Sequence, residues 1–348
     1  MNRCDRNLCM LAALATVVFL CGVRTFGQSG SAFDRGLAAF RAGNYSSASS
    51  LFAEAETESP GSTEALLYQA KSLVHLQDFA AADTALRSYS SSHPDSSDAL
   101  YMLGFVLHRQ NRPAESLAIY TKAAGITRPM ADDLKIVGLD YVLLDDYADA
   151  MKWLEKAVSM EPRNTDAWYC LGRAYYTVAR LDEAKKAFQI VLELDPRNVR
   201  AENNLGLIYE SSGAPDAAIE TYQRAIAWQQ DSQKPSEQPY VNLGNLLMEQ
   251  GQLKEAMAPL ESAVSLAPNN AYCRSTLGIY YHKIGRLEDA QRQLERATQL
   301  DPDNAVAHYQ LGRVYKDMNE LDRAQAEFNR TAEIKTRNAQ GSSSQSNH

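Results

Sequence analysis

Two stretches of the sequence, 106 residues apart, repeat almost the same pattern. Residues 171–196 read LGRAYYTVARLDEAKKAFQIVLELDP, and residues 277–302 read LGIYYHKIGRLEDAQRQLERATQLDP. Both begin with Leu-Gly, carry tyrosine three positions after the glycine and end with Asp-Pro. A separation of 106 is three steps of 34 plus four, which predicts a tandem array with one insertion of four residues.

A small residue marks the same position in each unit of this array. These residues are Gly36, Ala70, Gly104, Gly138, Gly172, Gly206, Gly244, Gly278 and Gly312. Neighbouring members are 34 residues apart, except that Gly206 and Gly244 are 38 apart. The excess lies in residues 231–239, a polar stretch with two prolines, which predicts a longer loop and a hinge between the units on either side.

Each unit contains two apolar patterns of helical period, separated by a Gly, Asn or Asp turn. Proline follows the second pattern in several units, where it stops the helix, at Pro162, Pro196, Pro268 and Pro302. The second pattern also carries a recurrent alanine, at Ala48, Ala82, Ala150, Ala184, Ala218, Ala256, Ala290 and Ala324. Small residues on both helices allow close approach, so each unit is predicted to be a helical hairpin.

These residues resemble the tetratricopeptide repeat (TPR), in nine copies over about residues 29–337. The best match is the set Trp168, Leu171, Gly172, Tyr175, Ala184, Phe188 and Pro196. The resemblance implies an all-α fold, a right-handed superhelical α-solenoid of helix-turn-helix hairpins. Some positions depart from the pattern, namely Ala32 and Arg35 in the first repeat, Ser116 in the third, and Thr331 and Thr336 in the ninth. The first and last departures fit terminal units, which no neighbour covers on one side.

The amino-terminal segment differs from the array. Arg3 and Arg6 precede an uncharged, mostly apolar run over residues 8–23, which is shorter than the ~20 residues of a membrane span. We therefore expect a signal peptide over 1–27 and export to the periplasm or cell exterior, with a bacterial envelope as the setting. An uncleaved anchor and a lipoprotein acylated at Cys21 are the alternatives.

We accordingly expect repeats one to six over 28–230, the insertion loop over 231–239, repeats seven to nine over 240–337, and a disordered tail over 338–348. Without residues 1–27 the chain carries 32 Lys and Arg against 42 Asp and Glu. No basic surface indicates nucleic acid, and no membrane contact is expected after signal removal. Cys170 and Cys273 belong to the fifth and eighth repeats, too far apart in a stacked array for a disulfide.

The motifs of common catalytic and metal sites are absent from the sequence. The six histidines never stand three or four residues apart, and no phosphate-binding loop or G-x-S-x-G occurs. The paired acids Asp132-Asp133 and Asp145-Asp146 fall where helix caps and turns are expected. We therefore expect a protein that is not an enzyme and that needs no cofactor and no metal.

The resemblance implies that the first helices line a concave groove that binds partners. Its positions are those six before, three before, one after, four after and five after the glycine. Over the nine repeats these positions hold nine bases and seven acids, so the groove is less acidic than the rest of the chain. The candidate binding residues are Tyr101, Phe105, His108, Arg109, Lys135, Tyr169, Arg173, Tyr176 and Asn203.

We expect these residues to bind an extended or helical protein or peptide segment, because Tyr and Arg dominate many interfaces. The sequence then favours a non-catalytic scaffold for assembling envelope or secretion components. A membrane-anchored spacer and a substrate-selecting subunit of an enzyme complex are the alternatives. The Lys-Asn clamp and the asparagine ladder of some related grooves are absent, since only Asn204 and Asn242 occupy the ladder position. The sequence gives no oligomeric state.

Overall fold

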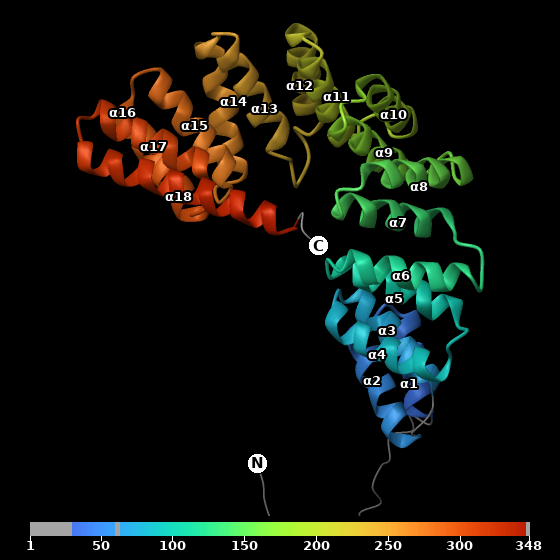
Figure 1. Ribbon diagram of the computed structural model, residues 1–348. Coiled ribbons are helices and arrows are strands. Elements are labelled where there is room, and N and C mark those ends of the chain that lie inside the picture. Colours follow the sequence, from blue (N-terminus) through green and yellow to red (C-terminus); the bar gives the residue numbers. More distant parts are fainter. Residues whose placement is uncertain (1–29, 60–62, 346–348) are drawn as a thin grey trace, which may run out of the picture. The chain divides into compact units, whose positions relative to one another are not determined.

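The computed structural model describes residues 30–59 and 63–345, and over these residues the chain is built from helices (Figure 1). The expected signal peptide lies outside the described residues. Consecutive helices pair into antiparallel hairpins, so the predicted all-α array of hairpins is confirmed. The chain divides into two units, residues 1–94 and 95–348.

The first unit contains two hairpins in its described part. Its helices are α1 (Ala32–Arg41), α2 (Tyr45–Glu58), α3 (Thr63–His75) and α4 (Phe79–Ser92). Phe52 is fully buried among Ala48, Ala55 and Ala65, and Phe33 and Tyr68 pack against the same core. The amino-terminal cap of α1 is formed by Ser31, whose hydroxyl accepts a hydrogen bond from the backbone N–H of Asp34.

The second unit contains seven hairpins. Its first helices are α5 (Ser97–Arg109), α7 (Ala131–Leu143), α9 (Thr165–Thr177), α11 (Val199–Ser211), α13 (Gln238–Glu249), α15 (Ala271–Lys283) and α17 (Ala305–Asp317). Its second helices are α6 (Pro113–Ala124), α8 (Tyr147–Met160), α10 (Leu181–Leu194), α12 (Pro215–Trp228), α14 (Leu253–Leu266), α16 (Leu287–Leu300) and α18 (Leu321–Gln345).

Within the second unit the two sets of helices form two layers. Each odd-numbered helix contacts the next odd-numbered helix, as α5 contacts α7 and α15 contacts α17. Extended contacts of this kind do not join the even-numbered helices in the described part of the chain. In a curved array of helix pairs, the layer on the inside of the curve follows the shorter path, so its helices come into contact with one another. The odd-numbered helices make these contacts, and they therefore lie on the inner side of this unit.

The turn inside every hairpin contains one residue in the left-handed conformation, seven positions after the marker glycine or alanine. These residues are Gly43, Gln77, Asn111, Asp145, Ala179, Gly213, Gly251, Gly285 and Asn319. Ala179, with φ of 58°, has neither the freedom of glycine nor a polar side chain that favours this region. The turn geometry is therefore imposed by the packing of the two helices.

A large side chain from the second helix occupies the space that the marker glycine leaves. A Cβ atom added at Gly206 would lie 2.3 Å from Cε1 of Tyr222, and one added at Gly104 would lie 2.7 Å from Cε2 of Tyr120. Tyr222 is fully buried. The residue sixteen positions after each marker glycine thus fills the space beside that glycine, and the recurrent alanine four positions earlier is buried as well.

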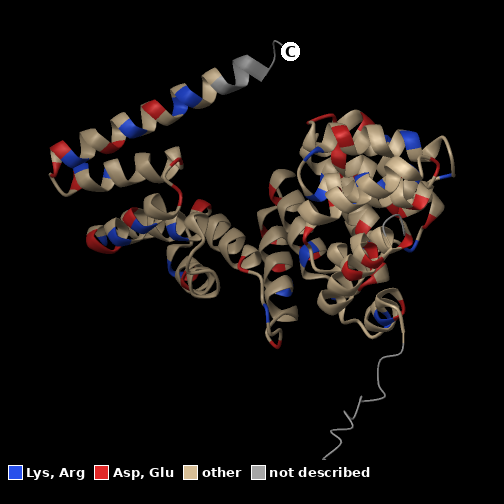
Figure 2. Cartoon of the chain, turned by 90° about the horizontal axis from the view of Figure 1, so that it is seen from below, with Lys and Arg blue, Asp and Glu red and all other residues tan. Residues whose placement is uncertain are grey.

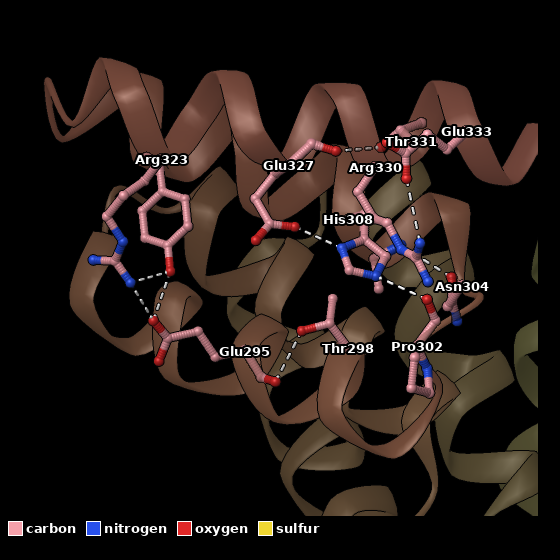
Figure 3. Close-up of polar contacts among 12 residues, drawn as sticks. Glu295, Thr298, Pro302, Asn304, His308, Arg323, Glu327, Arg330, Thr331 and Glu333 are labelled. Carbon is pink, nitrogen blue, oxygen red and sulfur yellow. Dashed lines mark hydrogen bonds and ion pairs between the residues drawn. The ribbon is translucent and has the colours of Figure 1, made fainter.

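Adjacent hairpins of the second unit are joined by a recurring Tyr–Glu–Arg contact. Tyr175 donates a hydrogen bond of 2.6 Å to Glu155 of the preceding hairpin, and the guanidinium of Arg180 lies 4.6 Å from the Tyr175 ring centroid. Figure 3 shows Glu295 and Arg323 of the contact made by Tyr315. The third example comprises Tyr281, Glu261 and Arg286. We call these three contacts the tyrosine clamps.

The departure at Ser116 has a local cause. Asp140, fully buried, stands two positions after Gly138, where most other repeats have an apolar residue. Ser116 Oγ lies 2.5 Å from Asp140 Oδ2 and 2.9 Å from the carbonyl oxygen of Gly104, so its one proton has two acceptors within reach, of which the carboxylate is the nearer. His108 Nδ1 lies 2.7 Å from Asp140 Oδ1. A serine therefore replaces alanine because the neighbouring hairpin buries a carboxylate that needs partners.

The connection between α12 and α13 is longer than the others but is held closed. The side chain of Gln229, 4% exposed, accepts a 2.7 Å hydrogen bond from Ser236 N and donates a 2.8 Å bond to Ser236 O. Helices α12 and α13 also pack as extensively as other neighbouring hairpins. This arrangement opposes the hinge that the length of the loop suggested.

The carboxyl-terminal helix is longer than expected. The sequence predicted a disordered tail from residue 338, whereas α18 continues to Gln345. Thr336 stands where other repeats have proline, so nothing in the sequence stops the helix there. Cys170 and Cys273 are both free, and they lie on α9 and α15. None of the described helices is long and apolar enough to cross a bilayer.

We predict that Ser116→Ala destabilises the protein, although alanine is the usual residue at this position. Removing the hydroxyl leaves the buried Asp140 carboxylate short of a hydrogen bond, which costs roughly 1–3 kcal/mol. Urea denaturation followed by circular dichroism measures the change. The double variant Ser116→Ala, Asp140→Ala should be less destabilised than the sum of its two single variants, because the contact between Ser116 and Asp140 is lost only once. A single variant as stable as the unmodified chain would contradict this account.

We predict that Gln229→Ala opens the loop over residues 230–236 without unfolding the hairpins. The variant loses both hydrogen bonds to Ser236, so subtilisin should cut this loop about ten times faster, since cleavage follows the open population. The exposed neighbour Gln230→Ala is the matched control. Equal cleavage rates in the two variants would show that the side chain of Gln229 does not close the loop.

Candidate partner-binding groove

The inner layer of the second unit carries two adjacent cavities, which together we call the groove. The first cavity, of about 290 Å³, is lined only by residues of α9, α11, α13 and α15 and of the turns before α13 and α15. The second, of about 550 Å³, lies between α13, α15 and α17. Figure 2 shows Lys and Arg interspersed with Asp and Glu over the described chain, with neither sign confined to one segment.

Side-chain amides are the most unusual feature of the first cavity. Five of them line it: Asn203, Asn204, Gln238, Asn242 and Asn270. Asn203, only 3% exposed, accepts a 2.9 Å hydrogen bond from Asn242 across the junction of α11 and α13. The Asn203 amide nitrogen and the Asn242 amide oxygen make no hydrogen bond to other described residues, so this amide pair retains one donor and one acceptor.

Three tyrosines form the aromatic part of the first cavity, and their positions are fixed by polar contacts. The Arg200 guanidinium lies 3.9 Å from the ring centroid of Tyr169, and Asn204 donates a 3.2 Å hydrogen bond to its hydroxyl. The hydroxyl of Tyr272 accepts a 2.8 Å bond from Asn245. The hydroxyl of Tyr176 lies 3.2 Å from Ser211 Oγ. The aromatic surfaces are therefore held in place before any partner binds.

The charges of the first cavity are few. Arg173 is exposed and makes no ion pair in the described part of the chain. Glu237 accepts a 3.1 Å hydrogen bond from Asn270. Burial raises the pKa of the Cys273 thiol to about 11, so this cavity residue stays protonated near neutral pH and is a poor nucleophile.

The second cavity is more strongly charged. His282 Nε2 lies 2.7 Å from Asp317, and Lys283 donates a 2.9 Å hydrogen bond to the carbonyl of Met248. Glu249 and Arg313 also line it. A cavity with charges of both signs that is open to solvent is more typical of the polar edge of a protein interface than of a closed ligand site.

The structure brings together four of the nine residues that the sequence suggested. Tyr169, Arg173, Tyr176 and Asn203 all line the first cavity. The other five lie on α5 and α7 and line neither cavity. They are engaged locally. Tyr101 donates to the carbonyl of Thr127, Arg109 lies over the Phe105 ring, His108 is the partner of Asp140, and Lys135 pairs with Asp132.

Several residues of the groove were not singled out by the sequence. Gln238, Val241 and Tyr272 occupy the same five positions relative to the glycine that define the candidate residues, so that rule contained the signal. Asn270 was missed because it belongs to a turn, where it also caps α15. In residues 30–59 and 63–345, no three His, Cys, Asp or Glu side chains are grouped to hold a metal ion.

Two family models, both described as tetratricopeptide repeat, match the chain. One matches residues 33–89, 69–131 and 169–235, and the other matches residues 142–191, 247–299 and 283–346. Together they cover most of the sequence outside the amino-terminal segment. A comparison with curated proteins finds no match.

Solved structures share the fold at low sequence identity. A tetratricopeptide repeat protein from Parabacteroides merdae is 20% identical, with 72% of this chain and 98% of that chain covered and a TM-score of 0.60. The APC/C hetero-tetramer Cut9-Hcn1 is 15% identical, with 81% and 55% covered and a TM-score of 0.58. PilW, a type IV pilus biogenesis factor, is 20% identical, with 57% and 90% covered and a TM-score of 0.51.

These identities show a common fold and nothing about a common partner. The two family models, the paired helices and the small residue at every helix crossing agree with one another. The chain therefore belongs to the tetratricopeptide repeat family.

Proposed function

We propose that the protein is a non-catalytic scaffold that binds a segment of another protein in the first cavity of the groove. The observation that carries this proposal is the buried Asn203, which accepts a hydrogen bond from Asn242, so that the pair retains one amide donor and one amide acceptor for a ligand. A peptide group also offers one donor and one acceptor, so an extended backbone matches this pair. An unused hydrogen-bonding group in a nearly buried side chain is costly unless a ligand or water pairs with it.

The aromatic wall supports a protein partner over a small polar metabolite. Tyr169, Tyr176 and Tyr272 offer broad rings that are already fixed by hydrogen bonds, which lowers the entropy lost on binding. Arg173 extends from the same wall and adds a cation for an acidic side chain of the partner. Tyrosine and arginine are the residues that most often dominate protein interfaces.

The non-catalytic part of the proposal rests on the family and on the chemistry of the groove. The two matching family models are repeat modules, and no catalytic family is indicated. The one thiol in the first cavity has a pKa raised by burial, which removes it as a nucleophile near neutral pH.

Export to the cell envelope, and a role in assembling its components, are also proposed. They rest on the sequence of residues 1–27, in which Arg3 and Arg6 precede a short apolar run. Fractionation of cells that express the full sequence tests this part of the proposal. A cleaved signal peptide predicts a shortened protein in a soluble fraction, whereas a retained anchor predicts the full-length protein in the membrane fraction.

The binding proposal predicts that Arg173→Ala, Asn203→Ala loses a partner that the unmodified protein captures. Residues 28–348 serve as bait in host cell extract, with mass spectrometry as the readout. The partner segment is then made as a peptide, and its affinity measured by fluorescence anisotropy. We expect Kd to rise at least about tenfold, since the variant removes a cation and a buried amide.

A cation on the outer layer provides the matched control. Lys186 is exposed on α10, and Lys186→Ala should capture and bind the same partner with unchanged affinity. Circular dichroism melting confirms that both variants remain folded. Capture of the same partners with equal affinity by all three proteins would place the binding surface outside the groove.

A further inference from the structure

A third cavity, away from the groove, lies at the junction of the third and fourth repeats. It has a volume of about 350 Å³ and is mostly apolar. Its lining comes from α6, α7 and α8, which follow one another along the chain (Figure 1). The lining residues are Leu117, Tyr120, Thr121, Ala124, Pro129, Leu134, Val137, Tyr141, Trp153 and Lys156. We call it the junction cavity.

Two local changes in the repeat open this cavity. Helix α6 ends at Ala124 after 12 residues, whereas α8, α10, α12, α14 and α16 each have 14. The last half-turn that would cover α7 is therefore missing. The second change is Thr121, a short side chain at the position where the tyrosine clamps have Glu155, Glu261 and Glu295.

The tyrosine of a clamp is nevertheless present at this junction. Tyr141 stands three positions after Gly138, as Tyr175, Tyr281 and Tyr315 stand after their own glycines. Those three hydroxyls donate to a glutamate of the preceding hairpin at 2.6, 2.9 and 2.6 Å. The Tyr141 hydroxyl makes no hydrogen bond among the described residues, and Thr121 donates instead to the carbonyl of Leu117. The junction cavity thus keeps the donor and lacks the carboxylate.

A cation lies at the same cavity. Lys156 makes no ion pair in the part of the chain that the structure describes, and its ammonium lies 5.4 Å from the Trp153 ring centroid. Lys152 approaches the same ring at 5.6 Å and has only Asp149, at 3.5 Å, as an acidic partner. In each clamp an arginine lies over the tyrosine ring, so a cation next to the tyrosine is common to both arrangements.

We propose that the junction cavity binds a small carboxylic acid with an apolar body. The carboxylate accepts a hydrogen bond from the Tyr141 hydroxyl, as a glutamate does at three other junctions of this chain. It also pairs with the Lys156 ammonium, as Glu295 pairs with Arg323. The aliphatic or aromatic body fills the space over Leu134, Val137 and Trp153. A free acid is favoured over a protein segment, because α6 still occupies most of the place of the clamp helix, and only its last half-turn and the glutamate side chain are missing. The volume falls in the usual range for small-molecule sites, about 300–1,000 Å³.

Isothermal titration calorimetry with 4-phenylbutyrate on the full chain tests this proposal. We expect saturable binding by 4-phenylbutyrate and at least about tenfold weaker binding by its neutral amide, because hydrogen bonds to a charged group are the stronger ones. Tyr141→Phe and Lys156→Met should each weaken binding of the acid about tenfold, and Lys156→Met should leave binding of the amide unaffected. Equal binding of acid and amide would overturn the recognition of a carboxylate.

A substitution that restores the clamp tests the location of the site. Thr121→Glu supplies the missing carboxylate from within the chain, so it should abolish binding of 4-phenylbutyrate and raise the thermal midpoint by about 1–2 °C. Thr121→Gln is the control of equal size without the charge, and it should keep part of the binding. Unchanged affinity in Thr121→Glu would place the acid elsewhere.

Titration with a peptide distinguishes a free carboxylic acid from an acidic side chain of a protein partner. A short peptide with adjacent Glu and Phe residues carries the same chemistry on a protein. Binding of this peptide without binding of the free acid would overturn the small-molecule assignment and indicate a protein partner at the junction cavity.

Discussion

The structure depends on one packing arrangement, repeated in every described hairpin whose marker residue is glycine. A large side chain of the second helix lies in the space that glycine leaves on the first, as Tyr222 does against Gly206. This contact sets the distance between the two helices, and the buried alanine four positions earlier keeps that distance small. With the helices so close, the turn between them must pass through the left-handed region, even where the residue is Ala179.

The second level of organisation joins one hairpin to the next, and it varies along the chain. Tyrosine clamps serve three junctions. The third and fourth repeats instead share a buried set of polar residues, in which Ser116 and His108 satisfy Asp140. Buried polar contacts of this kind are satisfied only when particular neighbours meet. They can therefore fix which hairpin stacks on which, a role that identical apolar surfaces cannot fill.

Much of this fold could be predicted from the sequence, because its determinants recur every 34 residues. The period, the marker glycines and the terminal prolines identified the hairpins, and the five groove positions also select residues that line the cavities, such as Val241 and Tyr272. Contacts that occur once could not be predicted in this way. Two such contacts depend on the path of the single insertion. They are the hydrogen bond between Gln229 and Ser236 and the pairing of Asn203 with Asn242, 39 residues apart. The choice of α9–α15 over α5 and α7 for the cavity also follows from three-dimensional packing, since both sets of helices present Tyr and Arg.

Function in such an array must come from the positions that the repeat leaves free. The glycine, the alanine and the large residue beside the glycine all pack inside the hairpin, so a substitution at any of them lowers the stability of the fold. The inner positions of the first helices lie outside this packing, so residues such as Arg173 and Tyr176 can differ from their counterparts in other repeats. The junction cavity follows a second route, in which a structural contact is left incomplete. Tyr141 remains where three other tyrosines meet a glutamate, and the missing carboxylate at Thr121 turns a joint between repeats into a site of defined chemistry.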